Sequence, residues 1–255
     1  MKIAVILRQV PDVVEELVIA EDGKSLAEDE IMSITNEADE HALEEALILK
    51  GRHAATITAF GVGGDEAKDA LATASAKGVD EAVLVRVPFE HRGDNHRLAS
   101  ILGPVLKSEG YGLILTGAWA ADQLDAGLAG LLAVHLSLPY VGGVMSVSVD
   151  ATGTRGTMDK EFPGGRLGVM DTSLPAVLGI QSAEQPPRYV PVSKVVQAKR
   201  ALRVRDVGEP PVVALGVRAT KLTKHESAAM AEMLPGDARQ VADQMVRLLR
   251  ERGMA

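Results

Sequence analysis

From the N-terminus to about residue 149, short apolar runs alternate with stretches in which apolar residues recur three and four positions apart. The short runs predict buried strands and the spaced pattern predicts helices. Because strands that alternate with helices form βαβ units, we expect an α/β fold, a mostly parallel sheet flanked by helices with right-handed crossovers. The predicted strands cover residues 2–7, 55–60, 81–85, 112–115 and 144–149, and the predicted helices cover residues 37–50, 65–77, 94–107 and 125–135.

After residue 149 the pattern changes. Turn-forming residues at 150–153 and 164–165 predict an added β-hairpin region, residues 175–180 predict a further sheet strand, and residues 193–200 predict a short helix. Residues 201–235 carry no clear pattern, and residues 237–252 predict an amphipathic helix. We therefore expect one domain over residues 1–200 and, over residues 201–255, an extended C-terminal arm and helix that contact a partner subunit. A free tail fits this last segment equally well.

The composition excludes several classes of protein. The 255 residues include 27 Lys and Arg against 35 Asp and Glu, a net charge of -8 that argues against general nucleic-acid binding. Without cysteine, the chain has no disulfide, thiolate metal site or cysteine nucleophile. The uncharged stretch 126–148 is long enough to cross a bilayer, but its glycines and Pro139 favour a buried helix, a turn and a strand. The first apolar run is too short for a secretion signal, so we expect a cytoplasmic protein.

Three predicted loops follow strands, where ligands bind in open α/β sheets: residues 8–12, 61–65 and 116–123. Glycines at 61, 63 and 64 fit either a phosphate-binding turn or an ordinary tight turn, with Asp65 as a helix cap. Trp119, the single tryptophan, could stack on a ligand or fill space. The six histidines show no metal-binding spacing, and the serines show no nucleophile elbow. The residues alone thus predict an α/β domain with a nucleotide site as one interpretation, and no catalytic or metal-binding group.

Seven segments, taken in order, resemble the beta subunit of electron transfer flavoprotein, and the chain resembles a divergent member of that family. The segments are 8–12 (RQVPD), 36–46 (NEADEHALEEA), 73–80 (TASAKGVD), 117–122 (GAWAAD), 174–177 (LPAV), 187–189 (PRY) and 194–200 (KVVQAKR). The resemblance implies a heterodimer with an alpha subunit that holds the main FAD, while the beta subunit binds AMP or a second FAD. It also implies a carrier, not an enzyme, between flavin dehydrogenases and a quinone oxidoreductase or another acceptor.

The resemblance also implies which residues bind. The cofactor site would comprise residues from four segments: Ile6, Asn36, Glu37, Ala38, Asp39, Val62, Gly117, Ala118, Trp119, Ala120, Ala121, Asp122, Gln123, Leu124 and Asp125. Partner docking would use Arg188, Tyr189, Val192 and Lys194, with Val192 as an exposed apolar anchor flanked by the charges of Arg188 and Lys194.

Departures from the family pattern keep two alternatives open. Trp119 stands where the family has glutamine, Leu124 where it has an acidic residue, and Glu37 where it has proline. One alternative is a stand-alone adenine-nucleotide-binding protein of the stress-protein or ATP-pyrophosphatase type. The other is a pseudo-subunit of the same fold that binds no nucleotide.

Overall fold

The computed structural model describes residues 1–123, 125–211, 217, 219–224 and 233–254. The chain divides into two compact units, Met1–Leu222 and Thr223–Ala255. Among the described residues of the second unit there is one helix, α7 (Ala238–Glu251), which begins with a capping box formed by Asp237 and Gln240. None of the residues of this helix is fully buried, and Met245, Val246, Leu248 and Leu249 are exposed.

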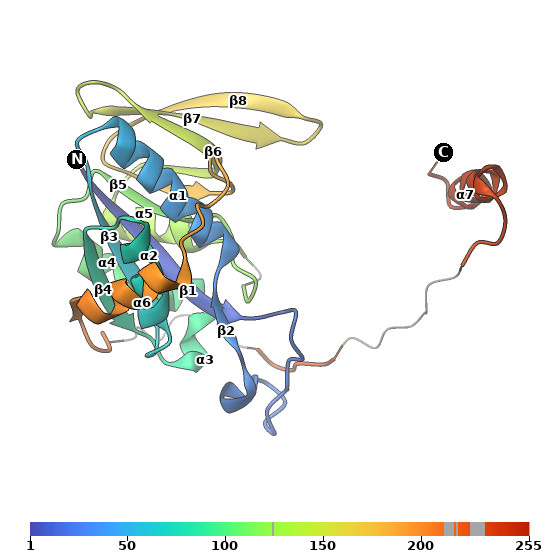
Figure 1. Cartoon of the computed structure of the whole chain (residues 1–255), viewed down its shortest axis with the longest axis horizontal. Coiled ribbons are helices and arrows are strands. Elements are labelled where there is room, and N and C mark those ends of the chain that lie inside the picture. Colours follow the sequence, from blue (N-terminus) through green and yellow to red (C-terminus); the bar gives the residue numbers. More distant parts are fainter. Residues whose placement is uncertain (124, 212–216, 218, 225–232, 255) are drawn as a thin grey trace. The chain divides into compact units, whose positions relative to one another are not determined.

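The first unit carries a ten-stranded sheet and six α-helices among its described residues (Figure 1). The strands are β1 (Lys2–Pro11), β2 (Ser33–Thr35), β3 (Thr56–Gly63), β4 (Glu81–Arg86), β5 (Leu113–Gly117), β6 (Tyr140–Val149), β7 (Arg155–Phe162), β8 (Arg166–Ser173), β9 (Ala176–Ile180) and β10 (Val204–Asp206). The helices are α1 (Glu37–Arg52), α2 (Ala67–Lys77), α3 (Phe89–Arg92), α4 (Asn95–Lys107), α5 (Leu128–Leu136) and α6 (Val192–Ala201).

The strand order is β10-β4-β3-β1-β5-β9-β6-β7-β8, with β2 paired to the end of β1. All neighbours from β10 to β6 are parallel, whereas β6, β7 and β8 form an antiparallel meander. The chain runs from β1 to β3 and β4 in one direction and returns to β5 on the other side of β1. The order therefore reverses between β1 and β5, the place where open α/β sheets bind ligands.

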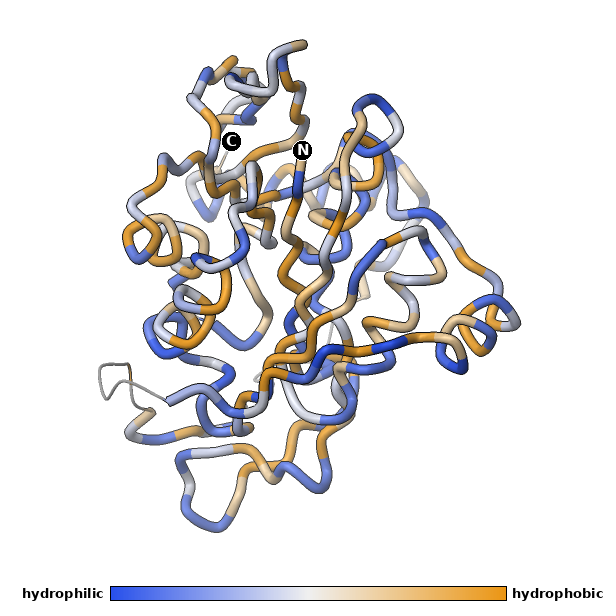
Figure 2. The backbone as a smooth tube through the Cα atoms, turned by 90° about the vertical axis from the view of Figure 1, so that its left-hand side faces the viewer, coloured by the Kyte–Doolittle hydropathy of each residue, from blue (hydrophilic) through white to orange (hydrophobic). Residues whose placement is uncertain are grey.

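Two hydrophobic clusters cover the two faces of the sheet. Alternate residues of β1 belong to different clusters, with Ile3 and Val5 in one and Ala4 and Ile6 in the other, because successive strand side chains point to opposite faces. The first cluster packs under α1 and α2, and the second packs under α4 and α5. Figure 2 shows hydrophobic residues concentrated along the strands in the middle of this unit. The predicted α/β class with a flanked, mostly parallel sheet is thereby confirmed.

Several boundaries differ from the predicted ones. β1 continues to Pro11, so residues 8–11 of the first predicted loop (8–12) are strand, because residues 9–11 pair with β2. α5 begins at Leu128 rather than Asp125. Asp65 does not cap α2, since its carboxylate binds Lys68 and Arg86 instead. β10, which the pattern did not predict, joins the sheet beside β4, within the first unit. The helices expected at 193–200 and 237–252 and the β6–β8 hairpins are present.

Across the described ranges, none of the helices is long and apolar enough to span a membrane.

Candidate functional site

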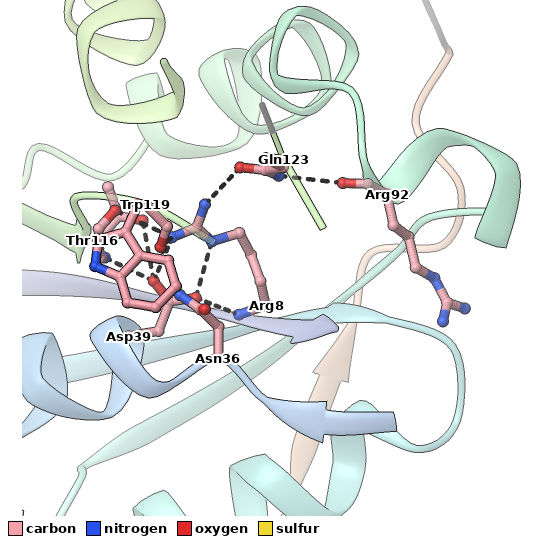
Figure 3. Close-up of polar contacts among 8 residues, drawn as sticks. Arg8, Asn36, Asp39, Arg92, Thr116, Trp119 and Gln123 are labelled. Atoms are coloured by element: carbon pink, nitrogen blue, oxygen red, sulfur yellow. Dashed lines mark hydrogen bonds and ion pairs between the residues drawn. The ribbon is translucent and has the colours of Figure 1, made fainter. Parts of the chain in front are cut away.

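A network of buried polar groups lies where β1, β5 and the first turn of α1 meet. Arg8 and Asp39, which are 2% and 0% exposed, form its centre. The Arg8 guanidinium donates from Nε to Oδ2 of Asp39 at 2.8 Å and from NH2 to Oδ1 at 2.7 Å (Figure 3). A fork of this kind satisfies both charges in a position where an unpaired one would be costly.

Asp39 also binds the backbone of two strands. Its carboxylate accepts the backbone N–H of Arg8 at 2.9 Å and that of Gly117 at 2.6 Å. A Cβ at position 117 would lie 2.7 Å from both Ala38 and Asp39, so only glycine permits this approach. One carboxylate thus fixes β1, β5 and α1 against one another.

Two buried donors hold the backbone of Trp119 while its ring stays accessible. The Trp119 carbonyl accepts from Arg8 NH2 at 3.1 Å and from Asn36 Nδ2 at 2.8 Å. Asn36 is 1% exposed and precedes α1, whereas Trp119 as a residue is 44% exposed. Figure 3 shows the indole beside the Arg8–Asp39 pair. An aromatic ring on a fixed backbone at a strand edge can serve as a stacking surface for a planar ligand.

Asp122, three residues after Trp119 in the same loop, supplies an acceptor. Its Oδ1 is buried and has no hydrogen-bond partner among the described residues. Burial raises the pKa of the Asp122 carboxyl to about 6, although the charges of Arg8 and Arg92 lower it. A buried carboxylate oxygen without a partner is costly, and a donor on a ligand would satisfy it.

In two other loops, carboxylates of this chain accept hydrogen bonds from glycine N–H groups. Gly64 N donates to Oε1 of Glu66 at 2.8 Å, and Arg92 pairs with the same oxygen at 2.7 Å. At the start of α5, Gly127 N donates to Oδ1 of Asp125 at 3.2 Å. Both N–H groups lie at loop positions where a phosphate could otherwise bind.

The predicted cofactor residues divide into three groups. Asn36, Asp39, Gly117 and Trp119 meet in the Arg8 network, and Gln123 joins it by accepting from Arg8 NH1 at 2.9 Å. The buried Ala38 and Ala120, the partly exposed Ala118 and Asp122, and the exposed Glu37, Ala121 and Asp125 lie on the same segments. The side chains of Ile6 and Val62 are buried in the second hydrophobic cluster, and Leu124 lies outside the described residues.

Sequence reasoning missed Arg8, Thr116 and Arg92 as individual members of this site. Thr116 Oγ1 donates to Asp39 at 3.4 Å, and the Arg92 carbonyl accepts from Gln123 at 3.3 Å. One signal was available: Arg8 directly follows five apolar residues of a strand, where a charge requires a buried partner.

The predicted docking residues follow β9. Arg188 pairs with the buried Glu44 of α1 at 2.7 Å, so its charge is not available as a free flank of the apolar anchor. Tyr189 and Val192 are 83% and 71% exposed, and Lys194 is exposed on α6. α6 itself packs on α2. The structure therefore presents two apolar side chains and a lysine on one surface segment.

Comparisons with known proteins agree with one another. A family model described as electron transfer flavoprotein domain matches residues 24–212. The chain is similar to proteins named electron transfer flavoprotein subunit beta. That of Bacillus subtilis (strain 168) is 33% identical over 201 residues, which cover 78% of this chain and 76% of the relative. That of Syntrophomonas wolfei is 31% identical over 232 residues, 86% and 89% of the two chains, and that of Methylophilus methylotrophus is 30% identical over 221 residues, 82% and 84%.

Proposed function

This chain belongs to the electron transfer flavoprotein family as a beta subunit, and from that premise we propose that it forms a heterodimeric electron carrier with an alpha subunit. The alpha subunit holds the main FAD, which supplies the redox chemistry when bound. The pair accepts electrons from flavin dehydrogenases and passes them to a quinone oxidoreductase or another acceptor. In this proposal the chain is a carrier subunit in the cytoplasm and has no substrate turnover of its own.

The observation that carries a nucleotide site is the combination of Trp119 and Asp122 at the reversal of strand order. The indole is accessible on a backbone held by Arg8 and Asn36, and the Asp122 oxygen lacks a donor among the described residues. An adenosine unit fits both features, because its base can stack and its amino group or ribose hydroxyls can donate. We therefore propose AMP, or the adenosine part of a second FAD, as the ligand at this edge.

A second candidate is a pseudo-subunit that binds no nucleotide. It is favoured by the carboxylates of Glu66 and Asp125, which already accept the N–H groups of Gly64 and Gly127. The Arg8 charge is likewise neutralised by Asp39. A phosphate bound at either glycine would have to displace the carboxylate of Glu66 or Asp125, or would be repelled by its negative charge.

Partner contacts divide between two regions in this proposal. The segment with Tyr189, Val192 and Lys194 docks dehydrogenases through a small, transient interface. The apolar side of α7, with Met245 and Leu248, contacts the alpha subunit, since none of the residues of this helix is fully buried.

The decisive experiment is to co-express the chain with an alpha-type subunit, purify the complex and identify the small molecules released on denaturation. One FAD and one AMP per heterodimer would support the carrier with a nucleotide site, and two FAD would identify the second ligand as flavin. FAD alone would establish the pseudo-subunit. If no complex forms and the chain is instead a homodimer that binds ATP, the stand-alone nucleotide-binding protein replaces the proposal.

A further inference from the structure

Side chains of α1 bind the segment that leads from β9 to the predicted docking residues, Arg188 to Lys194 (Figure 1). The Ala183 N–H donates to Nδ1 of His41 at 3.1 Å, and the Glu184 N–H donates to Oε2 of Glu45 at 3.1 Å. Residues 181–191 form no helix or strand, so these side chains take the place of backbone pairing. We call His41, Glu44 and Glu45 the α1 clamp.

The strongest contact of the α1 clamp is at Arg188. The Glu44 carboxylate accepts the backbone N–H of Arg188 at 2.9 Å and also its Nε and NH2 groups at 3.0 and 2.7 Å. Glu44 is 4% exposed, so its charge is stable there only with these donors. Backbone and side chain of Arg188 are therefore fixed together.

The second carboxylate of the α1 clamp is more deeply buried. Glu45 is 0% exposed and bridges two segments, because its Oε1 accepts the Val147 N–H of β6 at 2.7 Å. On the outer side, Arg52 of the same helix binds the Glu184 side chain through two bonds of 2.7 Å. Four side chains of one helix thus contact the segment between Ala183 and Arg188.

The held segment ends one residue before the exposed apolar side chains. Arg188 is fixed by Glu44, and Tyr189 and Val192 follow at 83% and 71% exposure. An interface built on a few apolar anchors loses affinity when the anchors must be ordered on binding. Fixing the preceding backbone removes part of that cost.

We propose that His41, Glu44 and Glu45 are positioning residues for partner docking: they hold residues 183–188 in one conformation, so that Tyr189 and Val192 are presented already ordered to an apolar pocket of a flavin dehydrogenase. This inference rests on the proposed carrier function. It assigns the role to residues that do not touch the partner.

The test uses the purified heterodimer with Glu44→Gln and, as a matched control on the same helix, Glu40→Gln. Glu40 lies one turn earlier, is 40% exposed at its side chain and contacts Lys77 at 3.9 Å, away from the held segment. For Glu44→Gln we expect faster hydrogen exchange at the Arg188 amide and faster trypsin cleavage after Arg188. With a flavin dehydrogenase that reduces the wild-type complex, the KM for the Glu44→Gln complex should rise about ten-fold while kcat stays unchanged. A ten-fold change corresponds to the free-energy cost of ordering roughly one residue on binding. Glu40→Gln should match the wild type in every measurement.

If Glu44→Gln does not assemble, His41→Phe removes the acceptor of the Ala183 N–H without changing a carboxylate, and it should raise KM in the same way. Restoration of the wild-type KM by Glu44→Asp, which keeps the charge, would support positioning. Faster exchange at Arg188 with an unchanged KM would overturn the inference and leave the carrier function standing. A wild-type complex that no flavin dehydrogenase reduces would instead overturn the carrier function itself.

Discussion

Two carboxylates of α1, Asp39 and Glu44, pair with arginines from other segments at the same closest distance but in different surroundings. The closest N–O distance is 2.7 Å both in Arg8–Asp39, which we call the inner pair, and in Arg188–Glu44, which we call the outer pair. The side chains of the first pair are 3% and 0% exposed, whereas those of the second are 43% and 4% exposed. Asp39 binds the backbone of two strands, β1 and β5, while Glu44 holds one surface segment. We therefore expect burial and the backbone groups bound to each pair, rather than the distance within it, to decide how much the pair contributes to stability.

The largest effect is expected from breaking the inner pair. Arg8→Met leaves Asp39 charged and buried with backbone N–H donors alone, which should lower the free energy of unfolding by about 3–5 kcal/mol. Denaturant unfolding of the purified protein measures this. The double variant Arg8→Met with Asp39→Asn removes the uncompensated charge and should recover part of the loss. A single-variant loss below about 1 kcal/mol would contradict the central role of the pair.

The carboxylate of each pair lies on α1, a helix that the sequence located well, yet only one partner of each pair was foreseen. The apolar spacing placed α1 within two residues, and the loop around Gly117 was found because it follows a strand. The pairing of Arg8 with Asp39 could not be read from the pattern, because it joins residues 31 positions apart through a particular strand register. Arg188 was taken as a free flank of Val192 for the same reason, since Glu44 lies 144 positions away. Local patterns predict elements, whereas buried polar partners depend on how the elements pack.

The second largest effect concerns Glu45, which lies beside the outer pair and is as deeply buried as Asp39. Burial raises the pKa of Glu45 from 4.5 to about 6, against the lowering effect of the Glu184 and Val147 N–H groups. The folded state therefore binds this proton more tightly than the unfolded state, and stability falls as pH rises from about 4.5 to 6. Glu45→Gln removes this contribution, so the stability difference between variant and wild type should shift by about 2 kcal/mol in favour of the variant between pH 4 and pH 7.

Unfolding curves of both proteins at several pH values test this expectation. Asp122 shifts in the same direction, so the slope of the wild type alone is not diagnostic and the difference between the two proteins is the quantity to follow. A difference that does not change with pH would mean that the two N–H donors fully compensate burial.

The third prediction distinguishes the contribution of the inner pair to stability from the binding of the ligand that we propose beside it. Trp119→Ala keeps the carbonyl that Arg8 and Asn36 bind but removes the indole. Stability should change little, while AMP affinity should fall about ten-fold through the loss of stacking. Calorimetric titration measures the affinity, and quenching of the single tryptophan by AMP provides an independent readout in the wild type. An unchanged affinity would remove Trp119 from the site.

The fourth effect is breaking the outer pair. Glu44→Gln should cost about 1 kcal/mol, because the half-exposed Arg188 head can be hydrated and the glutamine keeps one acceptor. The same unfolding measurement used for Arg8→Met places the two pairs on one scale. A loss equal to that of Arg8→Met would mean that exposure does not distinguish them.

The smallest effect is expected at a third pair, Lys68–Asp65, which completes the series at the same distance. It too closes to 2.7 Å, but its side chains are 42% and 73% exposed. Asp65 also contacts Arg86 at 3.0 Å, so it keeps a cation when Lys68 is changed. Lys68→Gln should alter the free energy of unfolding by less than about 0.5 kcal/mol, because water and Arg86 replace the ammonium. A loss above about 1 kcal/mol would show that exposure does not rank the three pairs, and the contrast between Arg8–Asp39 and Arg188–Glu44 would then need another cause.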